Sequence, residues 1–149
     1  MKTIIVGVDG SKHAEAALEF AIEEAALRGA RLRIVSAWEM PPVIEPMGFY
    51  PAEVIEDARE EAERIVGESV ARAKELQPQV ASEGIVVEGR AAAVLLEQAG
   101  RTDLIVVGSR GRGGFATLLL GSVSQEVVHH APCPVAVVRQ TEMSRDLSD

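Results

Sequence analysis

Residues 103–122 read Asp103-Leu-Ile-Val-Val-Gly-Ser-Arg-Gly-Arg-Gly-Gly-Phe-Ala-Thr-Leu-Leu-Leu-Gly-Ser122, an apolar run followed by a glycine-rich turn and the expected start of a helix. A continuous apolar run is typical of a strand that is covered on both faces of a parallel sheet. A glycine-rich turn between such a strand and a helix offers backbone N–H groups and a helix N-terminus to an anion. The stretch therefore predicts a buried strand that leads into a phosphate-binding loop.

Strand and helix patterns alternate along the whole chain. We expect strands over residues 3–9, 31–38, 79–87, 103–107 and 134–139, and helices between Ser11 and Gly29 and over residues 52–76, 91–99 and 122–130. Strict alternation requires a parallel sheet with helices on both faces and right-handed crossovers. The predicted fold is α/β: one doubly wound domain over residues 1–140, with a five-stranded parallel sheet in the order 3-2-1-4-5, followed by a polar tail over residues 141–149.

The predicted strand order brings two sequence signals together. Open α/β sheets bind ligands at the carboxyl ends of the strands, where the strand order reverses. In the order 3-2-1-4-5, the first and fourth strands flank that point. Asp9 ends the first strand and Gly108 ends the fourth, so we expect both residues at one crevice.

The glycine-rich loop matches neither of the two common nucleotide fingerprints. It contains no Gly-Lys-Ser/Thr, so it is not a P-loop, and its glycine spacing differs from Gly-x-Gly-x-x-Gly. Arg110, Arg112 and the hydroxyl of Ser122 are nevertheless suited to a small anionic ligand. Ser122 and Gln125 also have the spacing of a capping box, a structural role that is compatible with anion binding.

Composition and charge exclude several classes of partner. The formal net charge of −8 over 149 residues argues against a general affinity for DNA, RNA or anionic lipid, which needs a basic surface. The single cysteine, Cys133, leaves no internal disulfide and fits a reducing compartment. We find no basic and apolar leader before the first strand and no apolar run long enough to span a membrane. These observations predict a cytoplasmic protein without nucleic-acid or membrane partners.

Several segments together resemble the universal stress protein family. Gly108-x2-Gly111-x9-Gly121-Ser122 is similar to the nucleotide-binding motif of the ATP-binding branch of that family. Residues 5–11 (Ile-Val-Gly-Val-Asp-Gly-Ser), 121–124 (Gly-Ser-Val-Ser) and 133–138 (Cys-Pro-Val-Ala-Val-Val) extend the resemblance over nearly the whole chain. It implies a five-stranded α/β protein that binds ATP or a related adenine nucleotide. If ATP is bound, Mg is a candidate ion on its phosphates. It also implies homodimers that form through the last strand, here Val135–Val138.

The resemblance carries individual positions over to this chain. The residues at the positions that hold the adenosine are Val8, Asp9 and Ala37, and those that line the phosphate and ribose side are Val107, Gly108, Gly111, Arg112, Gly121, Ser122, Val123 and Ser124. Arg110 lies at a variable position of the same loop, and its positive charge makes it a further candidate for nucleotide binding. The chain departs from the family at Gly89-Arg-Ala-Ala-Ala93, where a small polar residue and a proline often open the third helix, so no ligand contact carries over there.

The sequence assigns no catalytic residue and no metal site. No carboxylate, histidine or lysine near the loop is an obvious catalytic base. His129 and His130 are expected at a helix end, where cationic side chains favour the helix dipole, and further metal ligands at a suitable spacing are missing. Three functions stay open: a regulatory nucleotide-binding protein, a slow ATPase or phosphotransferase that uses Asp9, and a dimerisation module without a ligand.

Overall fold

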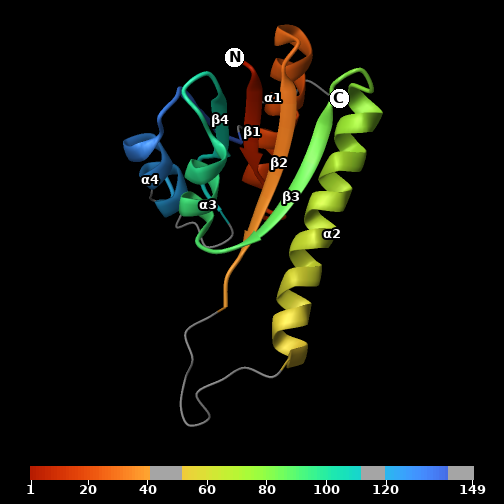
Figure 1. The fold of residues 1–149 in the computed structure, drawn as a ribbon, viewed down its shortest axis with the longest axis vertical. Coiled ribbons are helices and arrows are strands. Elements are labelled where there is room, and N and C mark those ends of the chain that lie inside the picture. Colours follow the sequence, from red (N-terminus) through yellow and green to blue (C-terminus); the bar gives the residue numbers. More distant parts are fainter. Residues whose placement is uncertain (41–51, 112–119, 141–149) are drawn as a thin grey trace.

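Five parallel strands form one sheet in the order β3-β2-β1-β4-β5 (Figure 1). The computed structural model describes residues 1–40, 52–111 and 120–140. The strands are β1 (Thr3–Gly7), β2 (Arg31–Trp38), β3 (Ser82–Glu88), β4 (Leu104–Gly108) and β5 (Val135–Val138), and the helices are α1 (Lys12–Arg28), α2 (Ala52–Leu76), α3 (Ala91–Gln98) and α4 (Ser122–His130). The fold class and the strand order predicted from the sequence are both confirmed.

β1 is the central strand, and β2 and β4 pair with it on either side in parallel. Ile4, Ile5 and Val6 of β1 are fully buried, as expected of a strand that is covered on both faces of the sheet. The register pairs Ile4 with Leu104 and Val6 with Val106, so two apolar runs that are far apart in the sequence lie side by side. The strand order reverses between β1 and β4, which makes the carboxyl ends of these strands the expected ligand position.

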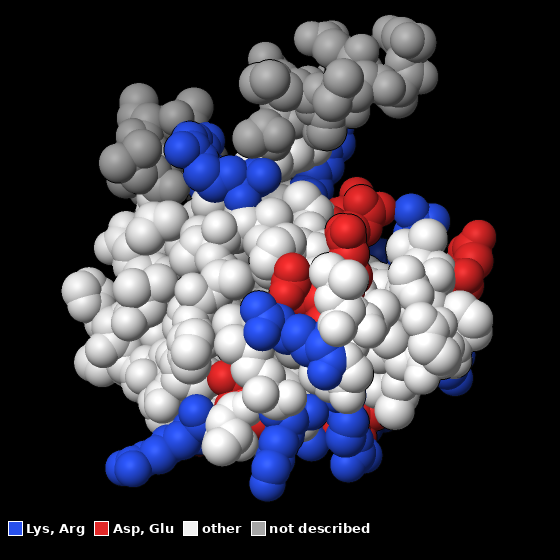
Figure 2. Space-filling view, turned by 90° about the horizontal axis from the view of Figure 1, so that it is seen from above, with Lys and Arg blue, Asp and Glu red and all other residues white. Residues whose placement is uncertain are grey.

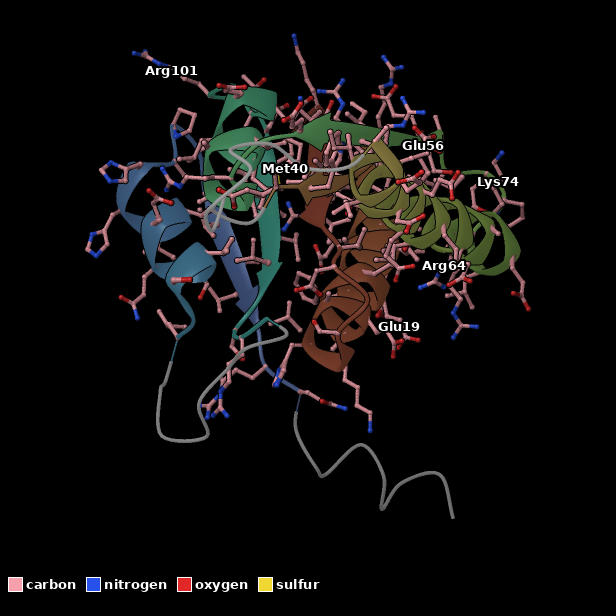
Figure 3. All side chains as sticks on the ribbon, turned by 90° about the horizontal axis from the view of Figure 1, so that it is seen from below. Glu19, Met40, Glu56, Arg64, Lys74 and Arg101 are labelled. Atoms are coloured by element: carbon pink, nitrogen blue, oxygen red, sulfur yellow. The ribbon has the colours of Figure 1, made fainter. Side chains whose placement is uncertain are left out.

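Two helices cover each face of the sheet (Figures 1 and 3). α1 and α2 pack on one face, against a buried cluster that includes Ile4 and Val6. α3 and α4 pack on the other face, where Ile5 and Ile105 belong to a second buried cluster. Successive residues of a strand belong alternately to the two clusters, because their side chains point to opposite faces of the sheet.

Both ends of α1 follow the predicted signals. The Ser11 hydroxyl accepts a hydrogen bond from the Ala14 N–H at 3.2 Å, which caps the start of the helix. Gly29 ends the helix in the left-handed conformation, with φ of 61°, and its N–H donates to the Ala25 carbonyl oxygen. Both ends of α1 are therefore capped by hydrogen bonds within the chain.

The predicted boundaries agree with the structure within two residues, except at the start of β3. β3 begins at Ser82 rather than at residue 79, because the Val80 N–H donates to the Gln77 carbonyl oxygen in a turn. The strand lies at one edge of the sheet and is only partly buried. The polar tail predicted over residues 141–149 lies outside the described residues.

Figure 2 shows the end of the molecule at which the strands begin. Lys and Arg side chains form separate groups there, with Asp and Glu side chains between some of them. The described part of this face therefore lacks the continuous basic surface that a nucleic acid would need. In the segments that the structure describes, no helix is both long and apolar enough to cross a membrane.

Candidate functional site

A cavity of about 420 Å³ opens where strands β1, β2 and β4 end. It lies at the reversal of the strand order, the position at which open α/β sheets bind ligands. Its volume is in the range of small-molecule sites. The lining comes from these three strands, the turn before α1, the first turn of α1, the loop after β4, α3 and the start of α4.

The cavity brings together predicted site residues from distant parts of the chain. Those that border it are Val8, Asp9, Ala37, Val107, Gly108, Arg110, Gly111, Gly121, Ser122, Val123 and Ser124. Arg112 lies outside the described residues. The structure thus places Asp9 and Gly108 at one crevice, while nucleotide binding by these residues stays a prediction.

The two sides of the cavity differ in chemistry. The side of β2 and α3 is apolar and is lined by Val35, Ala37, Ala91 and Leu95. The side of β4 and α4 is lined by glycines, by Arg110 and by the first turn of α4. Adjacent strands lie about 4.8 Å apart, so β2 and β4, which flank β1, are separated by about 10 Å. A ligand with an apolar ring at one end and an anionic group at the other matches this arrangement.

The first turn of α4 has backbone amides without a hydrogen-bond partner among the described residues. Its N-cap residue is Gly121, which makes no side-chain cap hydrogen bond. The Gln125 N–H makes the first helical bond, to the Gly121 carbonyl oxygen, so the preceding N–H groups of the helix have no intrahelical partner. The residues that carry these amides, Ser122–Ser124, border the cavity. A helix N-terminus of this kind favours an anion.

The prediction of a capping box at Ser122 and Gln125 is wrong. Gly121 takes the N-cap position, and the side-chain amide of Gln125 donates to the Leu120 carbonyl oxygen at 2.9 Å. Ser122 is exposed and is already the first residue of the helix. Because capping requires a side-chain acceptor at the N-cap itself, the glycine leaves the amides of the first turn uncovered.

Ser124 holds the two ends of the glycine-rich loop together. Its side chain is buried, and its hydroxyl lies 3.2 Å from the Ser109 carbonyl oxygen and 3.0 Å from the Gly121 carbonyl oxygen. The Ser109 carbonyl oxygen also accepts the Gly121 N–H at 2.6 Å. The hydroxyl of Ser124 is therefore engaged within the protein, and its backbone N–H is the group left for a ligand.

Replacing Ser124 with alanine is expected to lower the free energy of unfolding by about 1 kcal/mol, because a buried hydrogen bond is lost while each carbonyl keeps one backbone donor. Urea denaturation measures the change. Ser122→Ala is the matched control, since the Ser122 side chain is exposed, and its effect is expected to stay within about 0.5 kcal/mol. Equal losses in the two variants would contradict the role given to Ser124.

Asp9 is held beside the glycine-rich loop. One of its carboxylate oxygens accepts the Ser11 N–H at 2.9 Å. The other, Oδ2, lies so close to Gly111 that a Cβ at Gly111 would approach it to 3.0 Å. The absence of a side chain at Gly111 therefore allows the carboxylate to lie against the loop.

Five residues that line the cavity were missed by the sequence analysis: Gly7, Ala14, Val35, Ala91 and Leu95. Strand alternation could have found Val35, because it lies two residues before Ala37 and so on the same face of the sheet. Leu95 also packs against Gly7, where a Cβ would approach its Cδ1 to 3.0 Å. No local signal in α3 shows that Ala91 and Leu95 reach the ends of β1 and β2.

Arg90, at the start of α3, does not border the cavity. Its guanidinium donates to the carboxylate of Glu126 on α4, and this hydrogen bond raises the pKa of Arg90 above its usual value. The pair joins the helices that form one wall of the cavity. Both side chains are substantially exposed, so the pair adds little to stability.

A second cavity, of about 510 Å³, lies between α1 and α2. Both arginines that line it are paired, Arg72 with Glu19 at 3.0 Å and Arg64 with Glu68 at 2.9 Å. Figure 3 shows Glu19 on α1 and Arg64 on α2, on the two sides of this groove. Because its cations are already neutralised, this cavity is a poorer position for an anion than the one at the strand ends.

Cys133 and the histidines of α4 lie away from the lining of the first cavity. Cys133 packs against the cluster on the α3 and α4 face, and burial raises the pKa of its thiol, which keeps it protonated and weakly reactive. His129 and His130 lie in the last turn of α4, as expected. Within residues 1–40, 52–111 and 120–140, no group of three His, Cys, Asp or Glu side chains could hold a metal ion.

An open parallel sheet with a cavity where its strand order reverses defines a doubly wound α/β protein with a small-ligand site. Comparison with known families refines this class. The Universal stress protein family matches residues 1–139. The chain therefore belongs to the universal stress protein family.

Similar proteins carry the same family name. A universal stress protein of Mycobacterium tuberculosis is 41% identical over 138 residues, which cover 93% of this chain and 45% of that protein. The universal stress protein in the QAH/OAS sulfhydrylase 3'region of Thermus aquaticus is 40% identical over 140 residues, with coverages of 93% and 98%. A solved universal stress protein in complex with cAMP has a TM-score of 0.69 and 29% identity, with coverages of 94% and 98%. The chain thus spans less than half of the mycobacterial relative and nearly all of the Thermus one.

Proposed function

We propose that this protein binds ATP or a related adenine nucleotide in the cavity at the strand ends and acts as a regulatory sensor. The observation that carries the proposal is the uncapped N-terminus of α4 at a cavity that also presents Arg110 and Gly111. Backbone amides, a helix dipole and an arginine together suit a phosphate group. The cAMP complex of a related universal stress protein supports an adenine nucleotide as the ligand class.

The chemistry of the cavity suggests how the nucleotide lies. The base would pack against the apolar side, near Val35, Ala37 and Leu95, and the phosphates would extend toward α4. Asp9 would then lie close to the phosphates, and a carboxylate repels a polyphosphate unless a divalent cation lies between them. Mg²⁺ on the phosphates fits this requirement, and Oδ2 of Asp9 is the oxygen available to it.

The lining favours binding over rapid turnover. Among the described residues that line the cavity, Asp9 is the one carboxylate, and none is a histidine or a lysine. Efficient phosphoryl transfer needs a group that positions or activates the attacking nucleophile. Slow ATP hydrolysis through Asp9 is the second candidate function, because its carboxylate lies against Gly111 of the glycine-rich loop.

Protein purified without added nucleotide and then denatured is expected to release an adenine nucleotide, which chromatography and mass spectrometry identify. Incubation with ATP and Mg²⁺ then measures phosphate release, with Asp9→Ala as the matched variant. ATP binding without phosphate release supports the sensor. Phosphate release that disappears in Asp9→Ala would favour the ATPase. An empty protein that ignores added ATP would contradict nucleotide binding altogether.

We also propose a homodimer that forms through β5. Among the described residues this strand pairs with β4 alone and ends the sheet, so its outer edge is not paired with another described strand. Its residues Val135–Val138 are only half-buried in the single chain. Sedimentation is expected to give a dimer that Val137→Lys weakens. A monomer at every concentration, or a dimer that the lysine leaves unchanged, would contradict this interface.

A further inference from the structure

Two arginines among the described residues are half-buried, Arg33 and Arg110, and their surroundings differ. Arg33 donates to the Glu83 carboxylate at 2.7 Å and to the Gln98 carbonyl oxygen at 3.3 Å. Arg110 has a buried Nε without a hydrogen-bond partner among the described residues. A buried N–H group without a hydrogen-bond partner costs free energy, so this Nε points to a partner that the described residues do not supply.

The backbone of Arg110 is fixed at the start of the glycine-rich loop. The N–H of the preceding residue, Ser109, donates to the Val138 carbonyl oxygen at 2.8 Å, and the Ser109 carbonyl oxygen accepts the Gly121 N–H at 2.6 Å. A Cβ at Gly121 would lie 3.3 Å from the Arg110 Cα, so Arg110 lies against the N-cap of α4. Arg110 therefore borders the same cavity as the free amides of α4.

We propose that Arg110 sets the preference of this site for the number of phosphates on the nucleotide. The inference rests on the proposed function. The amides of α4 suffice for one phosphate, whereas a second or third phosphate gives the guanidinium a charge-assisted partner. Asp9 is the other charged residue in the described lining, and its carboxylate repels an added phosphate unless a divalent cation lies between them. Arg110 is thus the cationic side chain that the described lining offers to such a phosphate. ATP therefore binds more tightly than AMP, and the difference depends on Arg110.

Calorimetric titration of the full chain with ATP and with AMP, at one fixed Mg²⁺ concentration, measures the two dissociation constants. In Arg110→Gln the preference for ATP over AMP is expected to fall by about tenfold, equivalent to about 1.4 kcal/mol, through weaker ATP binding. Arg110→Lys keeps the charge without the planar fork and should retain part of the preference. Arg101→Gln is the matched control, because Arg101 is exposed and extends away from the molecule (Figure 3).

Thermal unfolding establishes that each variant is folded. An unchanged preference for ATP in folded Arg110→Gln would overturn the inference and leave nucleotide binding intact. Equal losses of ATP and AMP affinity would also overturn it, because Arg110 would then serve the first phosphate. If the unsubstituted protein bound neither nucleotide, the proposed function itself would fail, and this outcome is distinct from the other two.

Discussion

Gly121→Val is expected to weaken the binding of adenine nucleotide by about 100-fold, equivalent to about 2.7 kcal/mol, in a protein that still folds. The backbone of Gly121, with φ of −73° and ψ of 171°, is open to any L-residue. Its Cβ would lie 3.3 Å from the Arg110 Cα and 3.5 Å from the Ser109 carbonyl oxygen, which a small shift accommodates. The two γ-methyl groups would then occupy the start of α4, where the phosphate is proposed to bind.

Calorimetry with ATP measures this loss, and circular dichroism checks the fold. Gly67→Val is the matched control, because Gly67 is exposed in α2 and a Cβ there meets nothing within 4 Å. It should leave the affinity for ATP unchanged. A folded Gly121→Val protein with undiminished affinity for ATP would contradict the proposal that the phosphate binds at the start of α4.

Gly108→Ala is expected to lower the free energy of unfolding by about 2–3 kcal/mol, as overpacking of a fixed contact does. A Cβ at Gly108 would come within 2.8 Å of both the carbonyl carbon and the carbonyl oxygen of His13. These are backbone atoms in the first turn of α1, so no side-chain rotation relieves the contact. The end of β4 and the start of α1 must separate, and both lie beside the cavity.

Chemical denaturation measures the effect of Gly108→Ala against Gly67→Ala. The second substitution is expected to raise the free energy of unfolding by about 0.5–1 kcal/mol, because alanine favours a helix interior and nothing obstructs its Cβ. The same change of residue should thus act in opposite directions at the two positions. A Gly108→Ala protein as stable as the original would show that α1 and β4 can move apart freely.

The fold was predictable because local and global signals agree. The apolar runs that became β1 and β4 read as strands buried on both faces, and strict alternation with helices then left little choice of topology. The strand order alone predicts that Asp9 and Gly108 lie at the same cavity. The predicted strand order does not depend on exact helix boundaries, so an error of one or two residues in a boundary leaves it unchanged.

The missed features depend on single-residue positions or on tertiary contacts. The capping box failed because α4 has its N-cap at Gly121, one residue before the serine, and a sequence pattern rarely fixes a cap to one residue. The sequence also contained no sign that the buried Nε of Arg110 would have no hydrogen-bond partner among the described residues. Arg33 finds its partner Glu83 on a different strand, 50 residues away, and nothing in the sequence tells which arginine will find such a partner.

Calorimetric titration of nucleotide-free protein with ATP and Mg²⁺ tests the central claim most directly. We predict one ATP per chain with a dissociation constant in the micromolar range or tighter, a loss of about 100-fold in Gly121→Val, and full retention in Gly67→Val. Absence of heat on titration, together with no change in thermal stability at millimolar ATP, would contradict the account. The cavity at the strand ends would then hold no adenine nucleotide.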